Sequence, residues 1–411
     1  MMYKLLSIGT NLLNALLLCS LAVAQNSGSA NSAAEPSSVT VPLYLEDNRA
    51  FIDLTFTRAD GQPHKARCWI DTGGGGFLIT EPLARELSLD FSGEPAEEEG
   101  TRLVQVKSPA EARLGNMVLG KIPMMAVLGQ KTINFFVHAD CFIPGRLLKN
   151  YDVVIDYPAR QFTLAKPGTL KPRGVRMVTP VNPKNGFIRV EATVAGKPYG
   201  FLLDTGAAYT MVSQAVIDEW MAARSEWPRM TGAVGASNMI GGSYDAGLTM
   251  TRLPEIILEP LHVAQLGIVA RPAGTFEKWM SQMMTAPIVG AIAGNFLRGF
   301  RVQIDYAHGL TYLEQTGKLD PNDLDVAGLV LQPKADGSFL VAGVAKKDGK
   351  EILEGVAAGD KLLQIDGASV SGKTFPQILE ALRGKLGEVR SIVLERNGKT
   401  ITISVPIIHL L

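Results

Sequence analysis

Two copies of one tripeptide constrain this chain more than any other feature of its sequence. Asp71-Thr72-Gly73 and Asp204-Thr205-Gly206 each follow a short apolar run, residues 68–70 and 201–203, and each precedes another apolar segment. Glycine permits a tight turn and a close approach of the backbone to a neighbour. The pattern therefore predicts two buried strands that each deliver an aspartate into a tight turn, which is the layout of a paired-carboxylate site.

A second pair of segments indicates that a much longer unit is repeated. Residues 141–157 and 290–306 align without a gap, and both end in Ile-Asp-Tyr before a hairpin turn and a final strand. Self-similarity on this scale indicates an internal duplication. We therefore predict two homologous lobes, residues 39–167 and 168–320.

These motifs resemble the active-site loops of pepsin-like and retropepsin-like aspartic peptidases. In that family a hydrophobic-hydrophobic-Gly element follows each Asp-Thr-Gly and packs beside its loop, and two segments of this chain are similar to it. They comprise Ile143, Pro144, Gly145, Ile292, Ala293 and Gly294. The resemblance implies a mostly β fold with two acid-protease-type β lobes and short helices.

The same resemblance assigns roles to the residues of the two loops. Asp71 and Asp204 are the implied catalytic pair, because two carboxylates held close together share a proton, so that one acts as general base on a bound water and the other as general acid. No metal, cofactor or covalent intermediate is required. The implied supporting residues are Thr72, Gly73, Thr205, Gly206 and Ala207. Family members often have Ser, Thr or Ala after the glycine, so Gly74 departs from the pattern.

A third unit, residues 326–411, resembles a PDZ domain of the kind attached to bacterial secreted peptidases. The resemblance rests on Gly359-Asp360, on Ile365-Asp366-Gly367 and on an amphipathic helix at 374–383. It implies a small α+β domain that binds a ligand peptide along one strand. The implied peptide-binding residues are Gly328, Leu329, Val330 and Leu331. Val330 stands where that family often has a second glycine.

The N-terminus has the pattern of a targeting segment. Lys4 precedes an apolar stretch at 12–21 and a small-x-small site ending at Ala24, which predicts a signal peptide over 1–24 and secretion or a periplasmic location. Residues 25–38 are small and polar, as in a flexible linker. The apolar stretch is shorter than the ~20 residues that span a bilayer, so we expect no membrane anchor after cleavage. Cys68 and Cys141 are expected as either a disulfide or two buried thiols.

Charge and motif content exclude several other classes. Lys plus Arg equals Asp plus Glu, 40 each, so nothing favours nucleic acid as a partner. The five histidines are dispersed without metal-ligand spacing, and neither a Gly-x-Ser-x-Gly nor a phosphate-binding loop motif occurs. The partners that the two resemblances imply are a peptide or protein substrate and a PDZ ligand peptide.

Local patterns add a few elements to this outline. An Asp-Gly turn at 59–62 predicts a hairpin that feeds the first aspartate strand. Helices are expected at 81–87 and at 213–220, the second with Ser213 as its N-cap. The Gly-rich stretch over 231–235 and 241–244 is read either as a flap over a cleft or as a flexible surface hairpin.

The function predicted from these features is a secreted or periplasmic aspartic endopeptidase with a PDZ domain. A catalytically silent peptide-binding protein, with the inter-lobe cleft and the PDZ groove as two docking sites, is the alternative. In a third possibility the lobes are structural and only the PDZ domain is functional.

Overall fold

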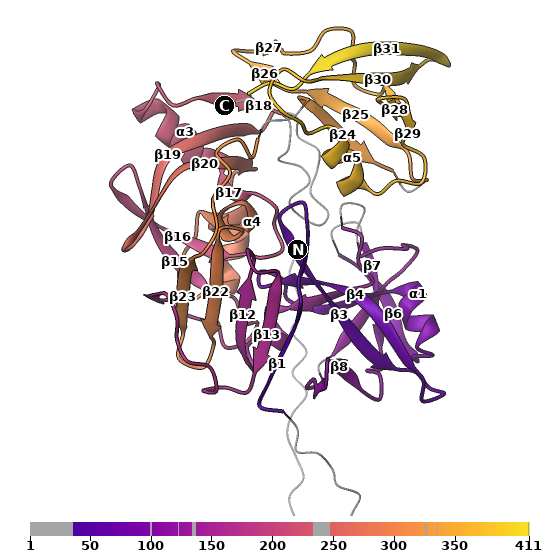
Figure 1. Ribbon diagram of the computed structural model, residues 1–411, viewed down its shortest axis with the longest axis vertical. Coiled ribbons are helices and arrows are strands. Elements are labelled where there is room, and N and C mark those ends of the chain that lie inside the picture. The colour runs from indigo at the N-terminus through magenta and orange to yellow at the C-terminus, as the bar shows by residue number, and fades with distance from the viewer. Residues whose placement is uncertain are drawn as a thin grey trace, which may run out of the picture. The chain divides into compact units, whose positions relative to one another are not determined.

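The computed structural model describes residues 36–98, 101–121, 123–133, 137–232, 247–324, 327–334, 336–409 and 411, and the described residues from Pro36 onward belong to one compact unit. These residues are mostly strand, with a few short helices (Figure 1). The prediction of a mostly β fold is confirmed. The predicted signal peptide and nearly all of the predicted linker lie outside the described residues. In the part of the chain that is described, no helix is both long and apolar enough to cross a membrane.

The N-terminal sheet presents Asp71 at the end of a central strand. Its strands, in spatial order, are β6 (Phe91–Glu98), β7 (Thr101–Val106), β10 (Met124–Val127), β5 (Phe77–Thr80), β11 (Cys141–Pro144), β4 (Pro63–Asp71), β3 (Arg49–Thr57), β8 (Ala112–Leu114) and β9 (Met117–Val118), with β2 (Tyr44–Glu46) paired to β3. β3 and β4 form the predicted hairpin. The parallel partner of β4 is β11, so the strand carrying the first hydrophobic-hydrophobic-Gly element lies directly beside the aspartate strand.

The C-terminal sheet repeats this central arrangement. Its strands, in spatial order, are β15 (Arg189–Val194), β16 (Lys197–Leu203), β21 (Gly290–Ile292), β17 (Thr210–Ser213), β20 (Leu261–Arg271), β19 (Thr249–Leu258), β18 (Arg229–Thr231), β26 (Lys346–Lys347) and β27 (Lys350–Glu351). β16 pairs in parallel with β21, as β4 does with β11. The duplicated sequence thus forms a duplicated strand pattern.

A third sheet joins the two halves of the duplication. Its strands, in spatial order, are β1 (Ser38–Pro42), β13 (Gln161–Ala165), β12 (Asp152–Asp156), β22 (Phe300–Asp305), β23 (Leu310–Gln315) and β14 (Val175–Val178). β12 and β22 contain the two Ile-Asp segments and pair antiparallel, with Asp152 opposite Asp305. The repeated segments therefore meet each other at the centre of this shared sheet.

The helices are short, and their caps explain where they begin. In α1 (Glu81–Glu86) the Thr80 side chain accepts the Leu83 N–H, as an N-cap does. α2 (Gly145–Leu148) and α4 (Gly294–Leu297) follow the two hydrophobic-hydrophobic-Gly elements. α3 (Gln214–Ala223) begins directly after Ser213, which is its N-cap residue as predicted, although the Ser213 side chain makes no capping hydrogen bond. Ser213 ends β17 and its hydroxyl has no hydrogen-bond partner among the described residues.

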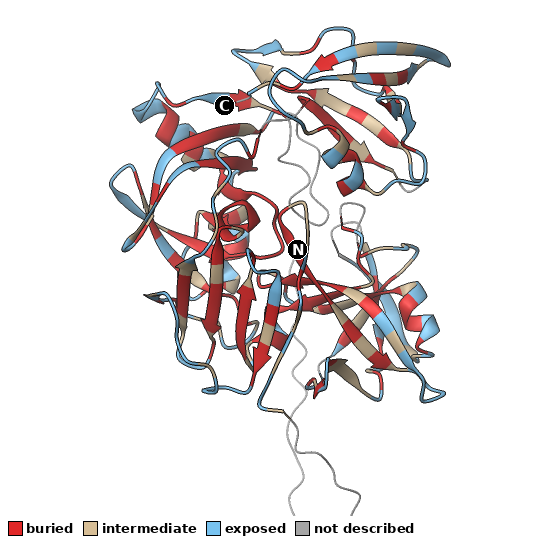
Figure 2. Cartoon of the chain, in the orientation of Figure 1, coloured by how far each residue is buried: buried red, intermediate tan, exposed pale blue. Residues whose placement is uncertain are grey.

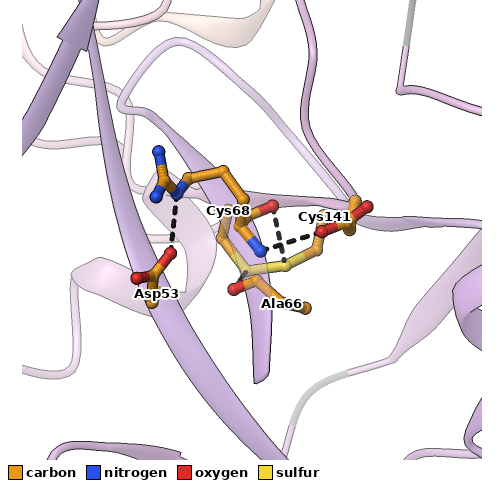
Figure 3. The surroundings of a disulfide bond; sticks show 6 residues. Asp53, Ala66, Cys68 and Cys141 are labelled. Atoms are coloured by element: carbon orange, nitrogen blue, oxygen red, sulfur yellow. Dashed lines mark hydrogen bonds and ion pairs between the residues drawn. A yellow bond between two sulfur atoms is a disulfide. The ribbon is translucent and has the colours of Figure 1, made fainter. Parts of the chain in front are cut away.

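The first aspartate strand is tied covalently to its neighbour. Cys68 and Cys141, opposite each other in β4 and β11, form a disulfide with their Cα atoms 4.4 Å apart (Figure 3). Figure 3 also shows Asp53 accepting a hydrogen bond from a guanidinium, which belongs to Arg67, at 2.6 Å. Of the two expectations for these cysteines, the disulfide is the one that the structure contains.

The C-terminal unit, residues 327–411, packs a helix against a small sheet. Its strands, in spatial order, are β24 (Leu329–Pro333), β25 (Phe339–Val344), β28 (Lys361–Ile365), β30 (Val389–Arg396) and β31 (Lys399–Pro406), with β29 (Ala368–Ser369) paired to β28. Thr374 caps α5 (Phe375–Ala381), and the Phe375 ring stacks on Phe339. The buried Asp360 accepts hydrogen bonds from Arg396 and from the Ala357 N–H, which explains the Gly-Asp turn before β28.

Buried side chains are concentrated on the central strands of these sheets, and exposed ones on the turns and edges (Figure 2). β16 ends in four consecutive buried residues, 200–203, directly before Asp204. A strand that is buried on both faces reads as a continuous apolar run. This accounts for the apolar runs that precede both aspartates.

Candidate active site

The two Asp-Thr-Gly loops meet through reciprocal hydrogen bonds between their threonines. Thr72 Oγ1 donates to the Leu203 carbonyl at 2.5 Å and accepts the Thr205 N–H at 3.1 Å. Thr205 Oγ1 donates to the Ile70 carbonyl at 2.9 Å and accepts the Thr72 N–H at 3.1 Å. Both hydroxyls are fully buried. Each loop therefore satisfies polar groups of the other, and the pair acts as one structural element.

Each aspartate carboxyl is held by its own loop and lies over the glycine of the other loop. Asp71 Oδ1 accepts the Gly73 N–H at 2.8 Å, and Asp204 Oδ1 accepts the Gly206 N–H at the same distance. A Cβ atom on Gly206 would lie 2.2 Å from Asp71 Cγ, and one on Gly73 would lie 3.0 Å from Asp204 Cγ. A side chain at either glycine would displace the facing carboxyl, so the motif requires glycine here.

Burial and proximity raise the pKa of both carboxyls. Asp71 and Asp204 are 8% and 9% exposed. Burial raises the pKa of Asp71 well above its usual range, and the negative charge of Asp204 raises it further. Burial also raises the pKa of Asp204, but hydrogen bonds from the Gly206 N–H, the Asp71 carboxyl and the Ala207 N–H oppose this rise. Two facing carboxyls with such pKa values retain a proton between them at pH values where an isolated aspartate is ionised.

The two hydrophobic-hydrophobic-Gly elements lie beside the strands that lead into these loops. Ile143 and Pro144 lie in register with Ile70 and Asp71, and Ile292 accepts the Asp204 N–H through its carbonyl. The Ala293 N–H donates to the Thr210 hydroxyl.

The glycines of these elements allow close backbone contacts, Gly145 with the first loop of its own half and Gly294 with the other half of the duplication. A Cβ atom on Gly145 would lie 2.9 Å from the Thr72 carbonyl oxygen, and one on Gly294 would lie 2.1 Å from the Asn48 carbonyl oxygen. These contacts leave no room for a larger residue at either position.

A cavity of about 420 Å³ opens over the two carboxyls. Both aspartates and the glycines at 73–76 contribute to its wall, and Arg146 is the cation among the residues that line it. Most of the remaining lining is apolar and comes from both sheets, from the helical turns at 275–283 and from loops. The apolar lining residues are Trp69, Leu78, Leu103, Met125, Ile133, Phe142, Phe187, Leu202, Met211, Phe276, Trp279, Met280 and Met283.

A buried arginine lies next to the second loop and is not among the residues predicted from the sequence. Arg49 is 2% exposed; its Nε donates to the Gly206 carbonyl at 3.0 Å and its Nη1 donates to Asp47 at 2.7 Å. Asp47 and Asn48 both have positive φ, 45° and 62°, and join β2 to β3 in a two-residue turn. The Asp-Asn pair is a recognisable signal for such a hairpin, whereas nothing local marks the contact between Arg49 and Gly206.

The repeated Ile-Asp-Tyr segments add two buried tyrosines. Burial raises the pKa of Tyr157, with a further contribution from the charge of Asp204. The pKa of Tyr306 is raised in the same way, by burial and then by Asp71. Neither hydroxyl has a hydrogen-bond partner among the described residues. Each half of the duplication thus places one buried tyrosine in the electrostatic field of the Asp71–Asp204 dyad.

The predicted peptide-binding strand of the C-terminal unit is present and largely buried. Leu329, Val330 and Leu331 lie in β24, the end strand of its sheet, which pairs with β25 along one edge. Val330 packs in a cluster with Tyr209 and Leu411. A Cβ atom on Gly328 would lie 2.4 Å from Ile352 Cδ1. In the Gly-rich stretch, residues 233–235 and 241–244 lie outside the described residues.

Parts of this chain are similar to known proteins in structure and in sequence. No family model matches the chain. An aspartic proteinase from Irpex lacteus is structurally similar over 68% of this chain and 98% of that chain, with a TM-score of 0.44 and 10% sequence identity. A 61-residue stretch, 15% of this chain, is 44% identical to FERM and PDZ domain-containing protein 2 of Mus musculus, and the match spans 4% of that protein.

Proposed function

We propose that this protein is an aspartic endopeptidase in which Asp71 and Asp204 activate a water molecule for attack on a peptide bond. The observation that carries the proposal is the pair of carboxyls, each placed over the other loop's glycine and both with raised pKa, in the wall of an apolar cavity. The reciprocal threonine hydrogen bonds fix this arrangement before substrate binds, and such preorganisation is what acid–base catalysis requires.

The chemistry follows from the single proton that the pair retains. The ionised carboxylate takes a proton from the water as its oxygen attacks the carbonyl carbon, and the protonated carboxyl donates its proton to the carbonyl oxygen. The tetrahedral diol then collapses: the carboxyl that took the water proton gives it to the amide nitrogen, the C–N bond breaks, and the other carboxylate regains a proton from a diol hydroxyl. Asp204 accepts two backbone N–H groups, from Gly206 and Ala207. This favours the negative charge on Asp204 and the proton on Asp71.

The cavity favours peptides with large apolar side chains on both sides of the cleaved bond. Its aromatic and methionine residues come from both sheets and from the helical turns at 275–283, and they include Trp69, Phe142 and Phe276. Burial of apolar substrate groups there provides binding energy of about 25 cal/mol per Å².

We further propose the domain division read from the sequence: lobes 39–167 and 168–320 followed by a PDZ domain at 326–411. The position of β24 at the end of its sheet is compatible with the addition of a ligand strand. Secretion after cleavage near Ala24 is part of the same proposal, and the disulfide supports it because such bonds persist in oxidising compartments.

Hydrolysis of a mixed peptide library at acidic pH tests the proposal. We expect cleavage that is inhibited by pepstatin and abolished in an Asp71→Asn variant. Asp90→Asn, whose side chain is 80% exposed, is the matched control and should cleave like the wild type. Capture of peptides without cleavage by the wild-type protein would instead support the catalytically silent peptide-binding alternative.

A further inference from the structure

One arginine of the C-terminal unit reaches into the surroundings of the second aspartate loop. Arg383 lies two residues after the end of α5, and its Nη2 donates to Asp47 Oδ1 at 2.9 Å and to the Tyr209 hydroxyl at 2.7 Å. Its side chain is 26% exposed and the Asp47 side chain is 4% exposed. The contact is therefore largely shielded from water, where a charged hydrogen bond is stronger than at the surface.

From Asp47 the hydrogen bonds continue to the dyad without a break. The other Asp47 oxygen accepts from Arg49 Nη1, and Arg49 Nε donates to the Gly206 carbonyl. The Gly206 N–H in turn donates to Asp204 Oδ1. Arg383 thus contacts the second loop indirectly through Asp47 and Arg49, and directly at Tyr209, three residues after Gly206.

We infer that Arg383 is a positioning residue for the dyad, so that the peptidase site is complete only when the C-terminal unit supplies this guanidinium. The inference rests on the proposed function. Asp47 lies between two guanidiniums, and loss of Arg383 leaves a buried carboxylate with one charged partner fewer and Tyr209 with one donor fewer. Both changes loosen the Asp47–Asn48 turn, which positions Arg49 to donate its hydrogen bond to the Gly206 carbonyl. A lysine keeps the positive charge of Arg383 but lacks its planar guanidinium group.

Docking of the C-terminal unit does not depend on Arg383 alone. β26 extends the C-terminal sheet by pairing with β18, where Thr231 lies opposite Lys346. Val330 and Tyr209 also share a hydrophobic cluster. Removal of Arg383 should therefore loosen the second aspartate loop while the C-terminal unit stays docked. The role of Arg383 in positioning the loop can thus be tested without loss of docking.

The test compares Arg383→Met and Arg383→Lys with Lys373→Met, an exposed cation just before the other end of α5. We expect Arg383→Met to lower kcat about 2- to 30-fold with KM little changed, and to speed hydrogen exchange at the Gly206 and Ala207 amides. Arg383→Lys should restore part of kcat. Lys373→Met should match the wild type in both measurements.

A folded Arg383→Met protein with wild-type kcat and wild-type exchange at Gly206 would overturn the inference. If Arg383→Met does not fold, Tyr209→Phe removes one acceptor of the same guanidinium, and unchanged kcat and exchange in that variant would overturn it as well. If the wild type cleaves no peptide, the proposed function fails, but the exchange comparison still decides whether Arg383 holds the loop.

Discussion

Where β4 and β11 are joined by the Cys68–Cys141 disulfide, the matching strands β16 and β21 carry Phe201 opposite Gly290. A Cβ atom on Gly290 would lie 3.0 Å from the Phe201 ring. A covalent bond and a ring packed over a glycine thus occupy the same place in the two halves. The duplicated backbone does not require one particular pair of side chains there.

The residue after each Asp-Thr-Gly also differs between the two halves, together with the strand residue at the position of Phe142. A Cβ atom on Gly74 would lie 1.9 Å from the Phe142 ring, so the ring fills the space that a side chain would need. In the second loop Ala207 has a side chain, and Ala291 is the residue that matches Phe142. The Ala207 N–H reaches the Asp204 carboxyl, whereas the Gly74 N–H donates to the Asp71 backbone carbonyl. This difference makes a nearly symmetric pair chemically unequal.

Loss of either carboxyl is the largest effect that we expect. Asp71→Asn and Asp204→Asn should each lower kcat/KM by about 10²–10⁴-fold, the range for loss of a general acid or base. The losses should be similar although the surroundings differ, because the pair shares one proton and acts as a unit. Peptide-cleavage kinetics check this, and tenfold or greater activity in one variant than in the other would show that the aspartates act independently.

The Asp71→Asn substitution should also change how the free energy of unfolding depends on pH. The folded-state pKa of Asp71 lies above the ordinary value of 3.8. The stability that the protonated group contributes is therefore complete below pH 3.8 and is lost as the pH rises through the folded pKa. Asparagine cannot ionise, so Asp71→Asn should gain stability over the wild type as the pH rises.

Urea unfolding across this pH range measures the difference. Asp360→Asn provides a control of opposite sign, because the hydrogen bond from Arg396 lowers the pKa of Asp360. Its stabilising effect is present above the ordinary pKa and lost as the pH falls. A constant difference between wild type and Asp71→Asn would contradict the raised pKa.

The disulfide and its counterpart should differ in their contribution to stability. The disulfide closes a loop of 73 residues, so replacing both cysteines with alanine should cost about 4 kcal/mol. Phe201→Leu in the second half should cost about 1 kcal/mol. Unfolding by guanidinium measures both, and equal costs would mean that the two pairs support their strands equally.

The threonines provide the case in which the two loops should behave alike. Thr72→Val or Thr205→Val removes a hydroxyl that donates one buried hydrogen bond and accepts another. Each change should cost about 2–4 kcal/mol, since both partner groups lose their bonds. Thr→Ser at either position keeps the hydroxyl and serves as the control. Urea unfolding that gave clearly unequal costs would show that the reciprocal geometry is not energetically symmetric.

The sequence predicted the parts of the site that depend on the duplication. Asp71 and Asp204 could be paired because each ends an apolar strand and belongs to one copy of a repeat, and copies related in this way meet at their common axis. The contact of Arg383 with Asp47 could not be predicted, because it joins residues 336 positions apart and leaves no periodic pattern in the sequence. Ser213 is the N-cap residue of α3 by position, but it also ends β17, and its side chain makes no capping hydrogen bond.

The last expected effect concerns the space that Gly74 leaves for the Phe142 ring. Gly74→Ala alone should cost about 1–3 kcal/mol because the methyl group overlaps the Phe142 ring. In a Phe142→Ala background the same change produces the alanine pair of the second loop, Ala207 and Ala291, and should cost much less. Urea unfolding of the four proteins in this cycle should therefore show a coupling energy of about 0.5–3 kcal/mol. Additive costs would mean that the ring moves aside freely, so that Phe142 would not be the reason for glycine at position 74.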